Sequence, residues 1–230
     1  MIKGLIFDKD GTLFDFNATW GAWTWQMITT ETADNPAKGT ALAEAMGYDM
    51  KNRRFLPGSV VIAATVEETA NVMLTVLTDD TQDTLIPRMN AAAGAVEQVQ
   101  AVPLIPLFDD LRARGLQLGI ATNDAAEPAL LNLTSAGVRD HFHFIAGYDS
   151  GHGAKPGTGQ LDAFCRQTGL APYHCAMIGD STHDLQAGRA AGMTTIGVLT
   201  GPAPAAELAP LADVLLPGIG HIPAWLDAQS

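Results

Sequence analysis

The sequence predicts an α/β protein, in which a parallel sheet with helices on both faces forms the core and a helical segment is inserted into that core. After Pro103, short apolar segments alternate with helical ones, and glycines close several of the helices. Between residues 15 and 100 this alternation is missing and helical signals dominate. A length of 230 residues suits one core with one inserted unit. We therefore expect a core of residues 1–14 and 101–230, and an insert of residues 15–100.

The core elements can be placed in order along the chain. Strands are expected at residues 2–7, 116–121, 142–146, 176–178, 194–199 and 213–216. Helices are expected between them at residues 104–114, 124–136, 158–168 and 183–191. Because strands that alternate with helices form parallel sheets, ligands should bind beyond the carboxyl ends of these strands.

The insert is predicted to be all-helical. One helix should begin at Pro36 and end at Gly47, since proline suits the first turn of a helix and glycine its end. Thr65 and Glu68 have the spacing of a capping box at the start of another helix. A further helix is expected over residues 83–99, with apolar residues at helical intervals.

The chain is acidic, with 13 Lys and Arg, 25 Asp and Glu, and a net charge of −12. The insert has five Lys and Arg and eleven Asp and Glu, and the core has eight and fourteen, so each part carries −6. A protein this acidic repels a phosphate backbone, so we expect no nucleic-acid partner. An anionic substrate must be held by local cations or by a metal ion.

The number of cysteines and the length of the apolar segments indicate the cellular compartment in which the protein is expected. Cys165 and Cys175 are the only two cysteines, which excludes a disulfide framework and suits a reducing compartment. The apolar start at residues 1–7 meets Asp8 at once and is too short for a signal peptide. No apolar run approaches the roughly 20 residues of a membrane span. We expect a cytoplasmic protein with no membrane partner.

The strongest chemical signal is Asp8-Lys9-Asp10-Gly11-Thr12-Leu13, which follows the first predicted strand. Residues two apart on a strand share a face, so Asp8 and Asp10 should project together and Lys9 should point away. Two close carboxylates repel each other, and a divalent cation relieves that repulsion. A calcium loop does not fit, because Gly11 is the fourth residue from Asp8 rather than the sixth. Taken alone, the pattern also fits an ordinary acidic turn.

Three further motifs follow in order at predicted strand ends. Ile120-Ala121-Thr122-Asn123 ends one strand, Lys155-Pro156 precedes a helix, and Ile178-Gly179-Asp180-Ser181-Thr182-His183-Asp184 ends another strand. With the FDxDGTL string at residues 7–13, they resemble the four motifs of the haloacid dehalogenase (HAD) superfamily. The resemblance spans the core and implies a Rossmann-like, HAD-like sheet. The position of the insert resembles the helical-cap branch, in which phosphoglycolate phosphatases are the most similar by overall pattern.

The resemblance implies a magnesium-dependent phosphatase that forms an aspartyl-phosphate. Asp8 would be the nucleophile. Asp10 would be the general acid for the leaving alcohol and then the base for the attacking water. The expected substrate is a small phosphorylated metabolite, and the sequence leaves its identity and the oligomeric state open.

The same resemblance implies the groups that hold phosphate. The Thr122 hydroxyl would bond a phosphate oxygen, helped by backbone N–H groups at Asn123 and at Asp10-Gly11. Lys155 would balance the negative charge of the phosphate and the nucleophile. Taken singly, Thr122 also fits a plain strand end, and Lys155 fits a solvated loop lysine.

A Mg²⁺ site is implied beside the nucleophile. Its ligands would be Asp8, the backbone carbonyl of Asp10, and Asp180. Asp184 would be a water-mediated ligand or a support for the other groups. Taken singly, Asp180 also fits a helix N-cap, and Asp184 a purely structural role.

The insert offers candidate substrate contacts. Trp20 or Asn17 would face the site if the first insert helix lies as in capped relatives, although helical spacing also fits packing within the insert. Arg53 and Arg54 are adjacent cations that suit either a substrate carboxylate or a solvated turn.

Three alternative functions remain open. A phosphonatase would use a lysine of the insert, Lys38 or Lys51, as a Schiff base, but Asp10 and Thr12 favour a phosphatase or mutase. A phosphomutase resembling β-phosphoglucomutase would use the same core and return the phosphate to a second hydroxyl. A non-catalytic phosphate-sensing or scaffold protein would need a broken motif, and none of the four motifs is broken.

Overall fold

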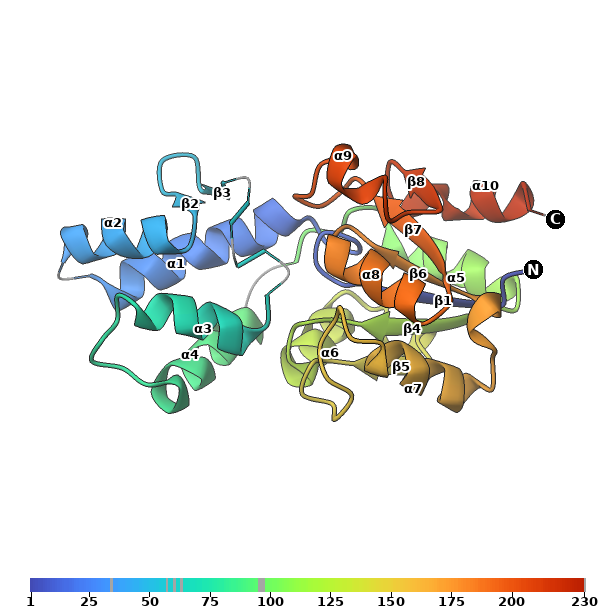
Figure 1. Cartoon of the computed structure of the whole chain (residues 1–230), viewed down its shortest axis with the longest axis horizontal. Helices are drawn as coiled ribbons and strands as arrows, with labels where there is room; N and C mark the ends of the chain where they lie inside the picture. Colours follow the sequence, from blue (N-terminus) through green and yellow to red (C-terminus); the bar gives the residue numbers. More distant parts are fainter. Residues whose placement is uncertain (34, 57, 60, 63, 95–97, 230) are drawn as a thin grey trace.

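The computed structural model describes residues 1–33, 35–56, 58–59, 61–62, 64–94 and 98–229. Figure 1 shows a layered α/β body joined to a smaller, mostly helical body formed by the insert. Among the described residues, no helix combines the length and apolar character needed to cross a membrane.

The core sheet has six strands in the order β5-β4-β1-β6-β7-β8, and every neighbouring pair is parallel. The strands are β1 (Gly4–Phe7), β4 (Gln117–Ala121), β5 (Phe144–Ala146), β6 (Cys175–Gly179), β7 (Thr194–Val198) and β8 (Val214–Leu216). Strand β1 lies centrally between β4 and β6 and is buried along its whole length. The six predicted strands are therefore all present, and the predicted fold class is confirmed.

Helices cover both faces of the sheet, because alternate strand residues point to opposite sides. Leu5 and Phe7 pack in a cluster with the apolar side of α5, whereas Ile6 packs with α7 and α8 in a second cluster. The core helices are α5 (Leu104–Ala113), α6 (Ala126–Ser135), α7 (Gly159–Thr168), α8 (Thr182–Ala190), α9 (Ala205–Leu208) and α10 (Ile222–Asp227). Short helical turns are η2 (Arg139–His141), η3 (Pro172–His174) and η4 (Ile219–His221).

The insert has its own hydrophobic cluster, whose buried members all lie between Trp23 and Met89. Its helical elements are η1 (Asn17–Gly21), α1 (Ala22–Glu31), α2 (Pro36–Ala45), α3 (Val66–Leu74) and α4 (Gln82–Gly94). Pro36 starts α2, and the predicted capping box of Thr65 and Glu68 starts α3. The separate cluster supports the proposed division into core and insert, whose boundaries stay a prediction.

Two details of the insert differ from expectation. The prediction of an all-helical insert needs correction, because β2 (Tyr48–Asp49) and β3 (Arg54–Phe55) form a short antiparallel pair in which Tyr48 faces Phe55. The helix predicted to reach Val99 ends at Gly94, and Val96 lies outside the described residues. Val99 instead accepts a backbone hydrogen bond from Asp15 at 2.7 Å, so the outgoing and returning segments run side by side.

Candidate active site

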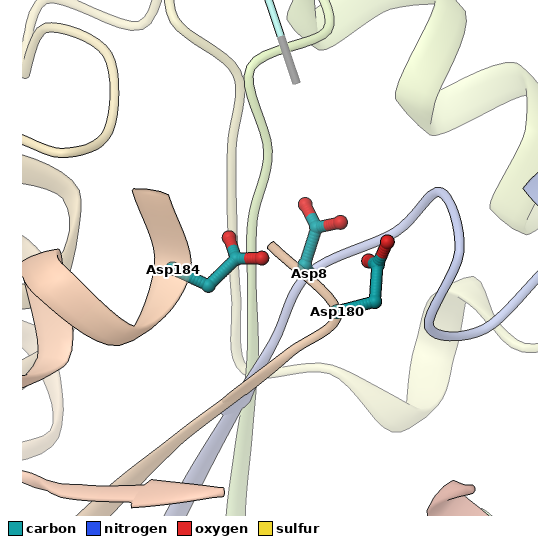
Figure 2. Close-up of side chains that lie close together, drawn as sticks. All are labelled: Asp8, Asp180 and Asp184. Atoms are coloured by element: carbon teal, nitrogen blue, oxygen red, sulfur yellow. The ribbon is translucent and has the colours of Figure 1, made fainter. Parts of the chain in front are cut away.

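Three aspartates meet at the carboxyl edge of the sheet (Figure 2). Asp8 follows β1, Asp180 follows β6, and Asp184 lies in the first turn of α8. They are 9%, 3% and 1% exposed, and one oxygen of each lies within 4.8 Å of the others. The Asp8 N–H donates to the Ile178 carbonyl at 2.8 Å, which continues the β1–β6 ladder to the first aspartate. The strand-end placement predicted from the motifs is therefore what brings the three carboxylates together.

Local geometry fixes Asp184. Ser181 is the N-cap of α8, and its backbone N–H and hydroxyl donate to Asp184 Oδ2 at 3.0 and 2.7 Å. This reciprocal capping box satisfies helix N–H groups and holds the carboxylate rigidly. Gly179 is required beside it, because a Cβ there would lie 2.3 Å from Asp184 side-chain atoms.

The loop after β1 fixes Asp180. The buried Thr12 hydroxyl donates to Asp180 Oδ1 at 3.1 Å. Gly11 has a φ of +79°, a conformation that glycine adopts readily, and a Cβ there would lie 2.3 Å from an Asp180 oxygen. The Gly-Thr pair of the first motif therefore positions the aspartate of the fourth.

Lys155 joins two of the carboxylates. Its buried ammonium donates to Asp8 Oδ1 at 2.7 Å and to Asp184 Oδ1 at 2.6 Å. Asn123 holds the lysine backbone from both sides: its Oδ1 accepts from the Lys155 N–H at 2.8 Å, and its Nδ2 donates to the Lys155 carbonyl at 2.9 Å. Asn123 thus has a positioning contact that the sequence did not predict.

The site carries more negative than positive charge. Burial raises the pKa of Asp8 to about 7, although the Lys155 ammonium acts to lower it. Burial, with Asp8 and Asp184 nearby, also raises the pKa of Asp180 well above its usual range. The two carboxylates beside Lys155 outweigh the cost of its burial and raise the pKa of its ammonium. The three buried carboxylates offer hard oxygen ligands, and a single ammonium leaves part of their negative charge unbalanced, which fits a divalent cation.

Lys9 does not point away from the site as strand alternation predicted. Strand β1 ends at Phe7, so its alternation does not reach Lys9. The fully buried ammonium lies 2.8 Å from Asp10 Oδ2 and 3.3 Å from Asp124 Oδ2. It also lies 5.5 Å from the centroid of the Trp20 ring, which belongs to the insert. Lys9 therefore contacts the proposed general acid, Asp10, and is itself paired with Asp124, and the sequence predicted neither contact.

Two of the groups predicted to bind phosphate, the Thr122 hydroxyl and the Gly11 N–H, lie in different surroundings. Thr122 is buried at the end of β4 and lines the same cavity as Asp8, as the motif predicted. The Gly11 N–H, in contrast, donates to the Phe14 carbonyl at 2.8 Å. This arrangement leaves Gly11 a role in the loop conformation and does not support its predicted role as a phosphate donor.

A cavity lies over the aspartates, between the core and the insert. Its core side includes Asp8, Asp10, Thr122, Lys155 and Asp180, and the insert contributes Trp20 among others. The other predicted contacts of the insert lie elsewhere. Among the residues that the structure describes, Asn17, Lys38, Lys51, Arg53 and Arg54 do not line this cavity.

Comparison with known proteins identifies the family. The model of the haloacid dehalogenase-like hydrolases matches residues 2–192, so the chain belongs to this family. A phosphoglycolate phosphatase of Yersinia pseudotuberculosis serotype I (strain IP32953) is 31% identical over 99% of this chain and 97% of its own length. One from Chromobacterium violaceum is 38% identical, but that match spans 49% of this chain and 50% of the relative.

Solved structures agree on the fold. A predicted phosphoglycolate phosphatase from Haemophilus somnus 129pt has a TM-score of 0.72 at 18% identity, with 98% of each chain covered. A HAD phosphatase from Thermococcus onnurineus has a TM-score of 0.67 at 19% identity, again with 98% of each chain covered. The family match and the full-length relative confirm the predicted resemblance, and the chain is an enzyme of the phosphatase type.

Proposed function

We propose that the chain is a Mg²⁺-dependent phosphatase that hydrolyses a small phosphomonoester through an aspartyl-phosphate on Asp8. The observation that carries the proposal is the group of Asp8, Lys155 and Asp180 on the floor of one cavity. The phosphoglycolate phosphatase relatives support the reaction class. A cytoplasmic location stays a prediction.

In the first step, an Asp8 oxygen attacks phosphorus and the bond between phosphorus and the leaving oxygen breaks. Asp10 gives its proton to that oxygen, so a neutral alcohol departs. In the second step, Asp10 accepts a proton from water while the water oxygen attacks phosphorus, and the Asp8 carboxylate is released with inorganic phosphate. Thr122 and Lys155 would hold the phosphate oxygens during both steps.

Asp8, Asp180 and the Asp10 backbone carbonyl would hold the Mg²⁺, which would supply positive charge to the ionised nucleophile and the phosphate. Both oxygens of Asp184 already accept hydrogen bonds, from Lys155 and from Ser181. Asp184 therefore suits the supporting role: it orients Lys155 and would reach the metal through water.

The test is phosphate release by the purified protein with Mg²⁺ and 4-nitrophenyl phosphate, compared with the Asp8→Asn variant. We expect turnover by the wild type alone. Turnover that survives Asp8→Asn would refute Asp8 as the nucleophile. No turnover by either protein would favour a non-catalytic phosphate-binding role, and isomerisation of a sugar phosphate without phosphate release would favour a mutase.

A further inference from the structure

The wall that the insert contributes to the cavity is mainly apolar. Trp23, Met46, Val66 and Met89 line it, together with further aliphatic and aromatic side chains. Trp23, Met46 and Met89 also belong to the buried cluster of the insert, so packing fixes this wall from behind. A leaving group that projects from the phosphate toward the insert meets hydrocarbon over most of its surface.

No Lys or Arg of the insert lines this cavity among the described residues. Arg88 pairs with Glu31 and Asp80, Lys38 with Asp79, and the Arg53 guanidinium lies 3.9 Å from the centroid of the Trp25 ring. The remaining two cations of the insert, Lys51 and Arg54, are exposed. The positions that the structure leaves undescribed contain no Lys, Arg or His in the sequence.

The core side of the cavity adds little positive charge for a leaving group. Lys155 is already held by Asp8 and Asp184, and Lys9 by Asp10 and Asp124. Of these two lysines only Lys155 lines the cavity, and the imidazole of His183 lines it as well. A carboxylate on the leaving group would give up its hydration in a negatively charged site that offers it no lysine or arginine partner.

Two buried donors on the insert wall point to a hydrogen-bond acceptor on the ligand. Trp23 Nε1 and Thr24 Oγ1 have no hydrogen-bond partner among the described residues, and the two residues are 6% and 0% exposed. Both residues line the cavity. Buried donors of this kind are normally satisfied, and a hydroxyl, ether or carbonyl oxygen of a bound molecule would satisfy them.

We infer that the substrate is the phosphate monoester of an uncharged, mostly apolar alcohol that carries a hydrogen-bond acceptor, and that a carboxylated ester such as phosphoglycolate is disfavoured. This inference rests on the proposed phosphatase activity and specifies its substrate class. The specificity lies in the wall that the insert contributes, whereas the reaction belongs to the aspartates of the core.

The test compares one ester that has an uncharged leaving group with two esters whose leaving groups carry a carboxylate. Phosphate release with Mg²⁺ is measured for benzyl phosphate, 4-carboxybenzyl phosphate and phosphoglycolate. We expect kcat/KM for benzyl phosphate to exceed the other two at least about tenfold. Equal or higher values for the carboxylated esters would overturn the inference, while their Asp8-dependent turnover would leave the proposed function intact.

A charge-addition variant tests the wall itself. Asn90 lies on α4 and lines the cavity, whereas its neighbour Ala91 is exposed and does not line it. Asn90→Lys should lower the preference for benzyl over carboxybenzyl phosphate about fivefold or more, and Ala91→Lys should leave the preference unchanged. The same change in both variants would contradict a specificity role for this wall.

A binding measurement separates the two proposals. Calorimetry with Mg²⁺ compares the non-hydrolysable benzylphosphonate and 4-carboxybenzylphosphonate on the wild-type protein. Binding of the uncharged compound should be at least about tenfold tighter. That result without any turnover would reject the proposed function and keep the ligand class, whereas tighter binding of the carboxylated compound would reject the ligand class.

Discussion

Replacement of Lys155 by methionine is expected to destabilise the fold strongly at neutral pH. The lysine ammonium lies 2.7 Å from Asp8 Oδ1 and 2.6 Å from Asp184 Oδ1, and all three side chains are buried. Removal of one partner from a buried ion pair costs about 3–5 kcal/mol, because the remaining charge is left unpaired. Methionine is an unbranched side chain that fills much of the lysine volume, so lost charge rather than a cavity dominates the change.

The pKa of Asp8 gives this loss its pH dependence. Burial raises the pKa to about 7 in the folded chain from an ordinary value of 3.8, so the folded chain binds more protons between these values. The contribution of Asp8 to stability is therefore lost as pH rises through that range. Lys155 acts to lower this pKa, so its removal raises the pKa further and extends the loss to higher pH. The variant should differ from the wild type least near pH 5 and most near pH 8.

Urea unfolding at these two pH values, with EDTA present, measures the difference in free energy of unfolding. Lys51→Met is the matched control, since Lys51 is exposed and should change stability by no more than about 0.5 kcal/mol. A loss below about 1 kcal/mol for Lys155→Met, or an equal loss at both pH values, would refute the charge coupling.

Three further predictions concern Asp8, Asp180 and Lys9. Asp8→Asn should lower kcat on 4-nitrophenyl phosphate more than about a thousandfold, as expected for a nucleophile, and a smaller loss in steady-state kinetics would contradict that role. Mg²⁺ at about 100 times its Kd should stabilise the wild type by about 2.7 kcal/mol in thermal unfolding, and Asp180→Asn should lose most of this gain; an unchanged gain would exclude Asp180 as a ligand. Lys9 contacts Asp10 and would hold the carboxyl of this proposed acid in position. Lys9→Met should therefore slow the hydrolysis of an alkyl phosphate, whose leaving group needs a proton, at least about tenfold more than that of 4-nitrophenyl phosphate, whose leaving group needs none. Equal losses for the two substrates would indicate a purely structural role of Lys9.

The sheet was predictable from the sequence because its physical cause is local. Strand β1 is buried on both faces, and such strands read as continuous apolar runs between turn residues. The capping box at Thr65 and Glu68 was visible for a similar reason, since both groups lie within one helical turn. The pair of β2 and β3 was not visible, because two-residue strands carry no period and depend on the contact between Tyr48 and Phe55.

The site was predictable only in part, because its contacts differ in sequence range. Asp8 and Asp180 could be predicted because each follows a strand, and parallel strands bring their carboxyl ends to one edge; Asp184 lies one helical turn beyond Asp180, in the first turn of α8. The environment of Lys9 was not found, because its partner Asp124 is distant in the chain and no local pattern links the two residues. Asn123 was expected to bind phosphate through its backbone, and its side-chain clamp on Lys155 likewise depends on the fold.

The difference between local motifs and contacts that depend on the fold also limits what similarity to phosphoglycolate phosphatases implies for this chain. The motifs place the proposed reacting groups at strand ends, so relatives that share these site residues support the proposed reaction. The proposed leaving group, in contrast, would face a wall assembled from separate helices of the insert. The example of Arg53 shows that the type of a residue alone does not decide whether it belongs to that wall. From the sequence, Arg53 was a candidate partner for a substrate carboxylate, because it is one of two adjacent cations. In the structure its guanidinium lies over the Trp25 ring, and Arg53 does not line the cavity. Relatives can therefore share the reaction class although the insert side of their cavities differs. The substrate has to be inferred from the residues that line the cavity of each chain.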